Sequence, residues 1–219
     1  MPPDALPPVT PDALPPVTTD ALAPVTRDGL MRGADGVVRC RWTGADAQYV
    51  AYHDTEWGRP VHDDVRLYEK LCLEGFQAGL SWITILRKRE TFREVFYGFD
   101  PERVAAMTSA DVDRLVLDAR IIRHRGKIEA TITNAQACIT TVEDVGSLDA
   151  LVWSYAETPP TPRRVSLTDT PSTTLASTAL SKDLKRRGWR FVGPTTVYAF
   201  LQSMGVVDDH MAGCHVPVA

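Results

Sequence analysis

Residues Tyr49 to Trp82 concentrate aromatic side chains around a single carboxylate. Tyr49, Tyr52 and Trp82 offer ring faces, and Glu74 lies in an otherwise aliphatic helix segment. Ring faces attract positive charge. A carboxylate on an apolar helix face is costly unless it is paired, so it is either part of an ion pair or a functional group. Together these groups would bind a flat, cationic ring. Aromatic residues at helical spacing are also ordinary core residues, so the residue types alone leave both interpretations open.

Two cysteines and two histidines form a second group that could do chemistry. Cys40 and His53 are separated by twelve residues, and His210 and Cys214 by three. Two cysteines with two histidines are the usual composition of a closed structural zinc site, which leaves no position for a catalytic water. Spacing does not show that the two halves meet, and buried cysteines with surface histidines are the alternative. His215 is a weaker candidate ligand than His210.

A short basic turn is the third feature, between a predicted helix over 111–118 and another from Gly126 onward. The first N–H groups of a helix lack partners within the helix and bind phosphate well. Arg123, Arg125 and Lys127 add positive charge, and Gly126 permits close approach of the backbone. Contacts of this kind position a protein on DNA without reading its sequence. A solvated basic face is the alternative interpretation.

The elements that position these groups are predicted to be helices. Apolar residues recur at intervals of three or four, and segments begin at capping residues or end at glycine. No segment sustains an alternation of apolar and polar residues, so we predict an all-α domain with short connections. The expected helices are 65–72 after Asp63 and Asp64, 82–96 after Ser81, one from Pro101 after Asp100, one after Ser109, 126–142, 175–187 before Gly188 and 196–204 before Gly205.

The first thirty residues repeat a unit of eight, first as Pro3 to Thr10, then as Pro11 to Thr18 and more loosely as Thr19 to Thr26. Proline in each unit blocks both helix and sheet hydrogen bonding. We therefore predict a disordered, proline- and alanine-rich extension over residues 1–36, followed by one folded domain over 37–219.

Bulk composition narrows the function classes. The chain has 219 residues, enough for one well-buried domain or two small ones, and its 44% of hydrophobic residues is typical of a globular protein. No apolar run reaches the roughly 18 residues of a membrane span, and no secretion signal is evident, so a cytoplasmic protein is expected. Four cysteines do not indicate a disulfide scaffold. The net charge of −4 argues mildly against nucleic acid, but residues 1–36 hold five aspartates against two arginines, and basic clusters lie at 120–127 and 182–190.

With these residues assembled, the chain resembles the 3-methyladenine DNA glycosylase I family over roughly residues 39 to 214. So many motifs in the same order are highly specific. They are Arg39-Cys40-Arg41-Trp42, Tyr49-x-x-Tyr52-His53-Asp54-x-Glu56-Trp57-Gly58, Leu73-Glu74-Gly75, Gln77 to Ile83, Ile121 to Ile128, Phe191-Val192-Gly193, Asp209-His210 and Gly213-Cys214.

The resemblance implies a helix–hairpin–helix DNA glycosylase fold in which a structural zinc ties the N- and C-terminal ends of the domain. By the same resemblance, the zinc ligands are Cys40, His53, His210 and Cys214, and the residues that line the base pocket are Tyr49, Tyr52, Glu74 and Trp82. Arg120 is a departure, because hairpin motifs often have glycine there, and the repeat extension lies outside the resemblance.

The implied activity is base-excision repair: hydrolysis of the N-glycosidic bond of 3-methyladenine in alkylated, double-stranded DNA, by a monomer. Glu74 is then the catalytic residue, Leu80 a wedge that fills the vacated base stack, and Arg123, Arg125, Gly126 and Lys127 DNA contacts. No lysine lies in the matched pocket motifs, so no Schiff-base lyase step is expected. A non-catalytic, zinc-containing DNA-binding module that recognises alkylated bases is the alternative, and 3-methylguanine is the nearest alternative substrate.

Overall fold

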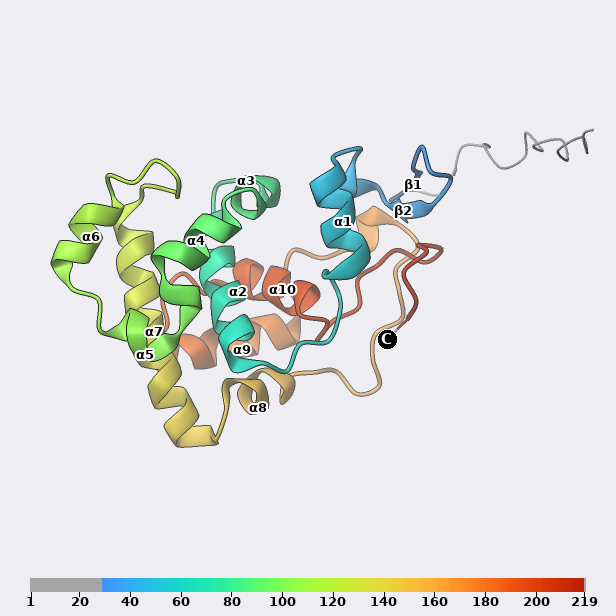
Figure 1. The fold of residues 1–219 in the computed structure, drawn as a ribbon. Coiled ribbons are helices and arrows are strands. Elements are labelled where there is room, and N and C mark those ends of the chain that lie inside the picture. Colours follow the sequence, from blue (N-terminus) through green and yellow to red (C-terminus); the bar gives the residue numbers. More distant parts are fainter. Residues whose placement is uncertain (1–28, 219) are drawn as a thin grey trace, which may run out of the picture.

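The computed structural model describes residues 29–218, so residues 1–28 of the extension predicted over 1–36 lie outside the described residues. The described chain is mostly helical (Figure 1). Its helices, in order, are α1 (Ala47–Thr55), α2 (Asp64–Gln77), α3 (Trp82–Leu86), α4 (Arg89–Val95), α5 (Pro101–Ala105), α6 (Ser109–Leu115), α7 (Arg125–Val145), α8 (Leu148–Trp153), α9 (Leu175–Arg186) and α10 (Pro194–Ser203), with 3₁₀ turns at Arg41–Thr43, Tyr97–Phe99 and Leu167–Asp169.

Helix α2 lies at the centre of the molecule and packs against α3, α7, α8 and α10 (Figure 1). All of its residues from Leu67 to Phe76 are buried, so it has no solvent-facing stripe along this stretch. The helix begins where the side chain of Asp63 accepts a hydrogen bond from the backbone N–H of Arg66 at 2.8 Å. A carboxylate on such a helix, including Glu74, is therefore held inside the protein.

The remaining elements lie on two sides of α2. Helices α4, α5, α6 and α7 lie on one side, and α1, two short strands and the C-terminal segment lie on the other (Figure 1). The N-terminal end of the described chain and the C-terminal segment thus lie close together, although they are far apart in sequence. This arrangement brings the two halves of the predicted metal site to the same side of the molecule.

The all-α prediction is wrong in one detail. Strands β1 (Leu30–Arg32) and β2 (Val38–Cys40) pair antiparallel, with Leu30 opposite Cys40. Strands of three residues are too short to show an alternating pattern in the sequence. Leu30 is buried in a small cluster with Cys40 and Met211, so the described fold starts before the boundary expected at residue 37.

Several predicted helix ends are confirmed. The side chain of Asp100 accepts hydrogen bonds from the N–H groups of Glu102 and Arg103, and Pro101 takes the first helical position of α5. Helix α9 ends just before Gly188, whose φ of 91° is one that residues with a side chain rarely adopt. The capping and stop signals in the sequence therefore place these helices correctly.

Two local predictions differ from the structure. The single helix expected from Ser81 to Phe96 is divided into α3 and α4 at residues 87 and 88, which an uninterrupted apolar period does not reveal. Helix α6 is capped by Thr108 instead of Ser109, because Thr108 forms a reciprocal capping box with Asp111.

The cysteines Cys40, Cys72, Cys138 and Cys214 are all buried, and none forms a disulfide. Between residues 29 and 218, no helix combines the length and the apolar character needed to cross a membrane.

Candidate functional site

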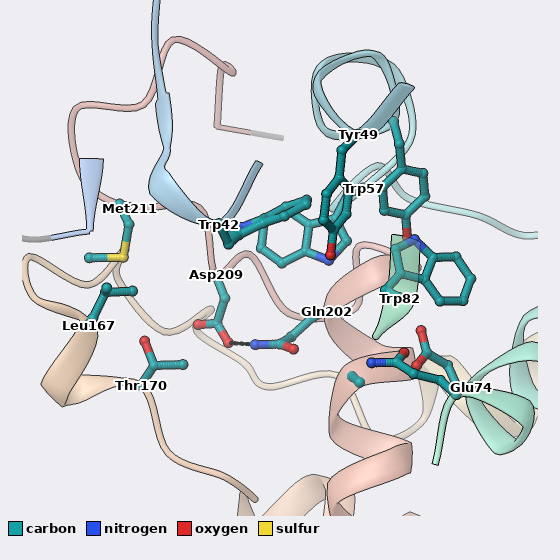
Figure 2. A pocket seen from close by; sticks show the side chains of 13 residues that line it. Trp42, Tyr49, Trp57, Glu74, Trp82, Leu167, Thr170, Gln202, Asp209 and Met211 are labelled. Atoms are coloured by element: carbon teal, nitrogen blue, oxygen red, sulfur yellow. Dashed lines mark hydrogen bonds between the residues drawn. The ribbon is translucent and has the colours of Figure 1, made fainter. Parts of the chain in front are cut away.

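A cavity of about 220 Å³ opens between α1, α2, α3, α10 and the C-terminal segment (Figure 2). Five of its thirteen lining residues are aromatic and several others are polar, which is the composition of a small-molecule pocket. All four predicted pocket residues line it. The lining residues are Trp42, Tyr49, Tyr52, Trp57, Glu74, Gln77, Trp82, Leu167, Thr170, Ala199, Gln202, Asp209 and Met211.

Glu74, Tyr52 and Trp82 are almost completely buried and come from three different helices. Figure 2 shows the carboxylate of Glu74 directed toward the Trp82 ring. The rings of Tyr52 and Trp82 are 5.5 Å apart between centroids, with 42° between their planes. The indole N–H of Trp82 is buried and has no hydrogen-bond partner in the described chain. A buried donor without a partner is costly, so it marks a position for a ligand acceptor.

A second aromatic group forms the neighbouring wall. The Trp42 ring makes edge contacts with Tyr49 at 4.9 Å, with Trp57 at 5.1 Å and with Tyr52 at 6.5 Å between centroids. The sequence left Trp42 and Trp57 as possible core residues. The structure gives them both roles, because they pack against the core and also line the cavity.

The two tyrosine hydroxyls of the cavity remain protonated at neutral pH. Burial raises the pKa of Tyr52 well above its usual value, and the negative charge of Glu74 raises it further. The pKa of Tyr49 is raised by the same two causes, in the same order. Both phenols can therefore donate a hydrogen bond to a ligand, whereas Glu74 is an acceptor.

Lys70 is a site residue that the sequence analysis missed. Its ammonium lies 2.9 Å from Glu74 Oε1, donates to the Tyr52 hydroxyl at 2.9 Å and lies 3.1 Å from the centre of the Trp82 ring. Burial lowers the pKa of Lys70 to about 8, although the charge of Glu74 acts in the opposite direction. The spacing of four residues between Lys70 and Glu74 is the signal that could have revealed the pair, because such residues share one face of a helix.

A second carboxylate, Asp209, lines another wall of the cavity. It accepts a hydrogen bond from Gln202 Nε2 at 2.9 Å (Figure 2). It also accepts one from the Tyr198 hydroxyl, and its other oxygen accepts from Arg164 Nε at 3.2 Å. Three donors fix this carboxylate in one orientation. The sequence analysis included Asp209 in a matched motif without assigning it a role.

The predicted metal ligands lie behind the aromatic wall. Cys40, His53 and Cys214 are buried, and their ligand atoms lie within 4.8 Å of one another. Cys214 Sγ is 3.5 Å from His53 Nε2. The hydrogen bond from the Cys40 thiol, followed by that from His53, lowers the pKa of Cys214, which favours a thiolate. The N-terminal pair of predicted ligands, Cys40 and His53, therefore does lie beside the C-terminal Cys214.

His210, the fourth predicted ligand, lies beside this group but is not among the three residues whose ligand atoms lie within 4.8 Å of one another. Its ring centroid is 5.1 Å from that of His53, and its Nε2 is buried and has no partner in the described chain. The Nδ1 atoms of His53 and His210 are each bonded to a carboxylate, Asp54 at 2.8 Å and Asp208 at 2.9 Å. Carboxylates in this position orient histidines that bind a metal through Nε2. His215 Nε2 is bonded to Asp54 at 2.9 Å.

Gly58 provides the space that the His210 ring occupies. A Cβ atom at this position would lie only 2.5 Å from Cε1 of His210. A larger residue would therefore displace the ring, which explains glycine at the end of the matched motif.

The basic turn joins α6 to α7. His124 caps α7, because its Nδ1 accepts a hydrogen bond from the backbone N–H of Lys127 at 3.2 Å. Arg123 and Arg125 are exposed, and Arg125 also bonds Asp113 at 2.6 Å. Arg120 does not have a positive φ, so the turn does not need glycine at this position.

The side chain of Lys127 does not face the surface, contrary to the prediction that it adds charge to a DNA-binding turn. It is buried, and its ammonium donates to the carbonyls of Phe76 at 2.8 Å and Ala78 at 2.6 Å. These are orphan carbonyls at the C-terminus of α2. Lys127 therefore fixes the start of the loop that carries Leu80, whose side chain is 42% exposed.

The chain belongs to the methyladenine glycosylase family, whose model matches residues 42–217. It is 51% identical over 177 residues to the DNA-3-methyladenine glycosylase 1 of Escherichia coli K12, which covers 80% of this chain and 95% of the relative. It is also similar to a crystal structure of 3-methyladenine DNA glycosylase I, with a TM-score of 0.78, 50% identity and coverage of 81% and 98%.

A structure of the Staphylococcus aureus enzyme, which concerns its recognition of 3-methyladenine, matches with a TM-score of 0.78 and 40% identity, covering 82% of this chain and 96% of that one.

The contact made by Lys127 leads to a stability prediction. Lys127→Met removes a buried ammonium that is the partner of two carbonyls at the end of α2, one of them at the buried residue Phe76, so it should lower the free energy of unfolding by about 2 kcal/mol. Lys88→Met is the matched control, because Lys88 also donates to two carbonyls, those of Ala119 and Arg120, but at an exposed site. Urea unfolding measures both variants. Equal losses in the two would contradict the role assigned to Lys127.

Proposed function

We propose that this protein is a monofunctional DNA glycosylase of base-excision repair, which hydrolyses the N-glycosidic bond of 3-methyladenine in alkylated DNA. The observation that carries the proposal is that one aromatic cavity is lined by both the carboxylate of Glu74 and Trp82, whose buried N–H has no partner in the described chain. Membership of the methyladenine glycosylase family supports it.

The polar groups of the cavity suit the edge of an adenine. Adenine presents a donor at N6 and an acceptor at N7. The Glu74 carboxylate accepts from the amino group, and the N–H of Trp82 and the hydroxyl of Tyr52 donate to ring nitrogens. The base reaches them only after it has been extruded from the double helix, which costs a few kcal/mol and less for a weakened pair.

The chemistry needs little acid–base assistance. Methylation at N3 makes the attached purine cationic, so it is already a good leaving group. As the base departs, the sugar becomes oxocarbenium-like and water attacks it. Glu74 is the catalytic residue in the sense that it holds the departing base, and selectivity comes from fit in the transition state. Lys70 is enclosed by Glu74, Tyr52 and Trp82, which agrees with a mechanism without a Schiff base.

DNA binding is assigned to the surface that carries the α6–α7 turn and Leu80. The turn acts as a helix–hairpin–helix motif: Arg123, Arg125 and the N–H groups at Gly126 contact phosphates. Leu80, exposed on the loop after α2, fills the gap that the extruded base leaves. The partner is double-stranded DNA with alkylated bases, and the protein acts as a cytoplasmic monomer.

A structural zinc is the second part of the proposal. The four donors Cys40, His53, His210 and Cys214 fit the ion: three lie within 4.8 Å, and the fourth, His210 Nε2, is a buried atom without a partner. A zinc ion with four protein ligands supplies folding energy and no catalytic water. It would hold the two ends of the domain together beside the cavity.

A non-catalytic module that recognises alkylated bases is the alternative function. Such a module would need the cavity but would not release the base. Chromatography of the bases liberated from methylated DNA separates the two functions and also compares 3-methyladenine with 3-methylguanine.

The pocket assignment predicts the effect of two conservative variants. Glu74→Gln removes the charge, and Trp82→Phe removes the N–H but keeps a ring, so each should slow excision of 3-methyladenine by at least about 100-fold. Glu90→Gln, at a side chain that is 79% exposed, is the control and should be unaffected. The rate is that of base release from methylated DNA. Wild-type rates in Glu74→Gln would remove that residue from the mechanism.

The assignment of the basic turn predicts a change in the salt dependence of binding. The double variant Arg123→Ala and Arg125→Ala should lower the slope of log affinity against log salt by about 2, close to one for each lost phosphate contact. Arg186→Ala, from the other basic cluster and 74% exposed, is the control. Arg186→Ala should leave the slope unchanged. If Arg186→Ala lowers the slope and the double variant leaves it unchanged, the DNA binds at the basic cluster over 182–190 instead.

The zinc assignment predicts about one zinc per chain by metal analysis. His210→Ala should lose most of the metal and lower the unfolding temperature, because it removes one of four ligands. His62→Ala is the matched control, since this histidine is 60% exposed and bonded to Asp149. Full metal content in His210→Ala would mean that another residue is the fourth ligand.

A further inference from the structure

Phe191 lies in the turn between α9 and α10, and its backbone has a conformation that residues with a side chain rarely adopt. Its φ is 56°, in the left-handed region, where a Cβ atom is strained and glycine is not. The ring is nevertheless 37% exposed, so burial of the ring does not fully offset the strain. A strained residue that presents an apolar ring to solvent indicates a role other than packing.

Buried polar side chains hold this turn on both sides of Phe191. The side-chain amide of Asn134 accepts from the backbone N–H of Arg190 at 2.7 Å and donates to the Arg190 carbonyl at 3.1 Å. The hydroxyl of Ser181 donates to the carbonyl of Val192 at 2.6 Å. Asn134 and Ser181 are both buried, so these hydrogen bonds are shielded from water. The fold therefore fixes the backbone that carries the Phe191 ring.

The Phe191 ring lies where the elements assigned to DNA binding meet. Its centroid is 6.2 Å from that of His124, which caps α7, and the two rings are arranged edge to face with 83° between their planes. A Cβ atom at Gly75 would lie only 3.2 Å from the Cβ of Phe191. The turn therefore packs directly on the last turn of α2, which leads into the loop that carries Leu80.

An exposed aromatic ring at this junction suits a duplex from which one base has been withdrawn. Extrusion of a base leaves neighbouring nucleotides partly unstacked, and proteins that distort DNA place apolar side chains against such steps. The contact between an aromatic ring and a nucleotide needs no charge on the protein and does not depend on the base sequence. Phe191 would thus add an apolar contact to the phosphate contacts of the α6–α7 turn.

We propose that Phe191 is a second apolar DNA contact, which packs against a nucleotide beside the step that Leu80 fills. The inference rests on the proposed glycosylase function and on the DNA-binding surface assigned with it. Its consequence is that the strained turn between α9 and α10 stabilises the distorted duplex from which the base has been extruded.

The test removes the ring without adding backbone strain. Asparagine tolerates the left-handed region better than most residues with a side chain, so Phe191→Asn should fold, which urea unfolding checks. It should bind a duplex with a central abasic site at least about tenfold more weakly than the wild type, and it should slow excision from methylated duplex by a similar factor. Phe191→Tyr keeps the ring and should stay within about threefold of the wild type.

Tyr97→Asn is the matched control. Tyr97 is also 37% exposed and has a φ of 55°, but its ring lies against Arg103 of α5. Tyr97→Asn should therefore bind the abasic duplex as the wild type does. Equal losses of affinity in the two asparagine variants would overturn the proposal, because the loss would then follow from removing any strained, exposed ring.

The salt dependence of binding separates a DNA contact from structural support of the α6–α7 turn. An apolar contact releases no counter-ions, so Phe191→Asn should weaken binding and leave the slope of log affinity against log salt unchanged. If the ring only supported His124, its loss would disturb the phosphate contacts of Arg123 and Arg125 and lower the slope. A lowered slope, or wild-type affinity, therefore contradicts the role of Phe191.

Failure of this inference can be told from failure of the proposed function. A wild-type protein that releases no base from methylated DNA would show that the glycosylase assignment is wrong. A wild-type protein that releases the base, together with a folded Phe191→Asn that does so at the same rate, would overturn the assignment of Phe191 alone. If Phe191→Asn does not fold, Phe191→Gly takes its place, because glycine adopts this φ without strain.

Discussion

The buried ion pair between Lys70 and Glu74 is the interaction around which the site is built. Both side chains lie on the central helix, less than a tenth of each is exposed, and they are one helical turn apart. Removing either charge from water costs several kcal/mol unless the other is in place. A hydrophobic pair would fill the space more cheaply, but it would not place a hydrogen-bond acceptor in an aromatic cavity. The ion pair therefore lowers the stability that the fold could have, and in return it places the Glu74 carboxylate in the cavity.

The cysteine and histidine group supports the same cavity from outside. The Trp42 ring is 5.3 Å from His53, and the Trp57 ring is 4.6 Å from His210, between centroids. The residues that would hold a metal thus pack directly against two aromatic walls of the pocket. Any contact that draws the N-terminal and C-terminal segments together also fixes these walls, so the geometry of the cavity depends on both ends of the domain.

The sequence predicted much of this arrangement because its signals are local or motif-based. Caps such as Asp63 and Asp100 locate helix starts, and the matched motifs identify Glu74 and Trp82 as neighbours in space. The sequence could not show the paired strands at Leu30, which are too short for a pattern, or the inward direction of Lys127. That direction depends on where the end of α2 lies relative to α7, and this is a property of the packing.

The hydrogen bonds and the ion pair that hold the two carboxylates of the cavity explain why such an enzyme does not remove normal bases. Asp209 is held by three donors and Glu74 by Lys70, so neither is placed to activate water strongly. A strong acid or base in this cavity would also assist the departure of unmodified adenine, which fits the same shape apart from a methyl group. With weak assistance, only a base that leaves readily is removed at a useful rate. The methylated base is therefore removed because it leaves readily, and the protein contributes a cavity in which the rate of base release depends on that leaving ability.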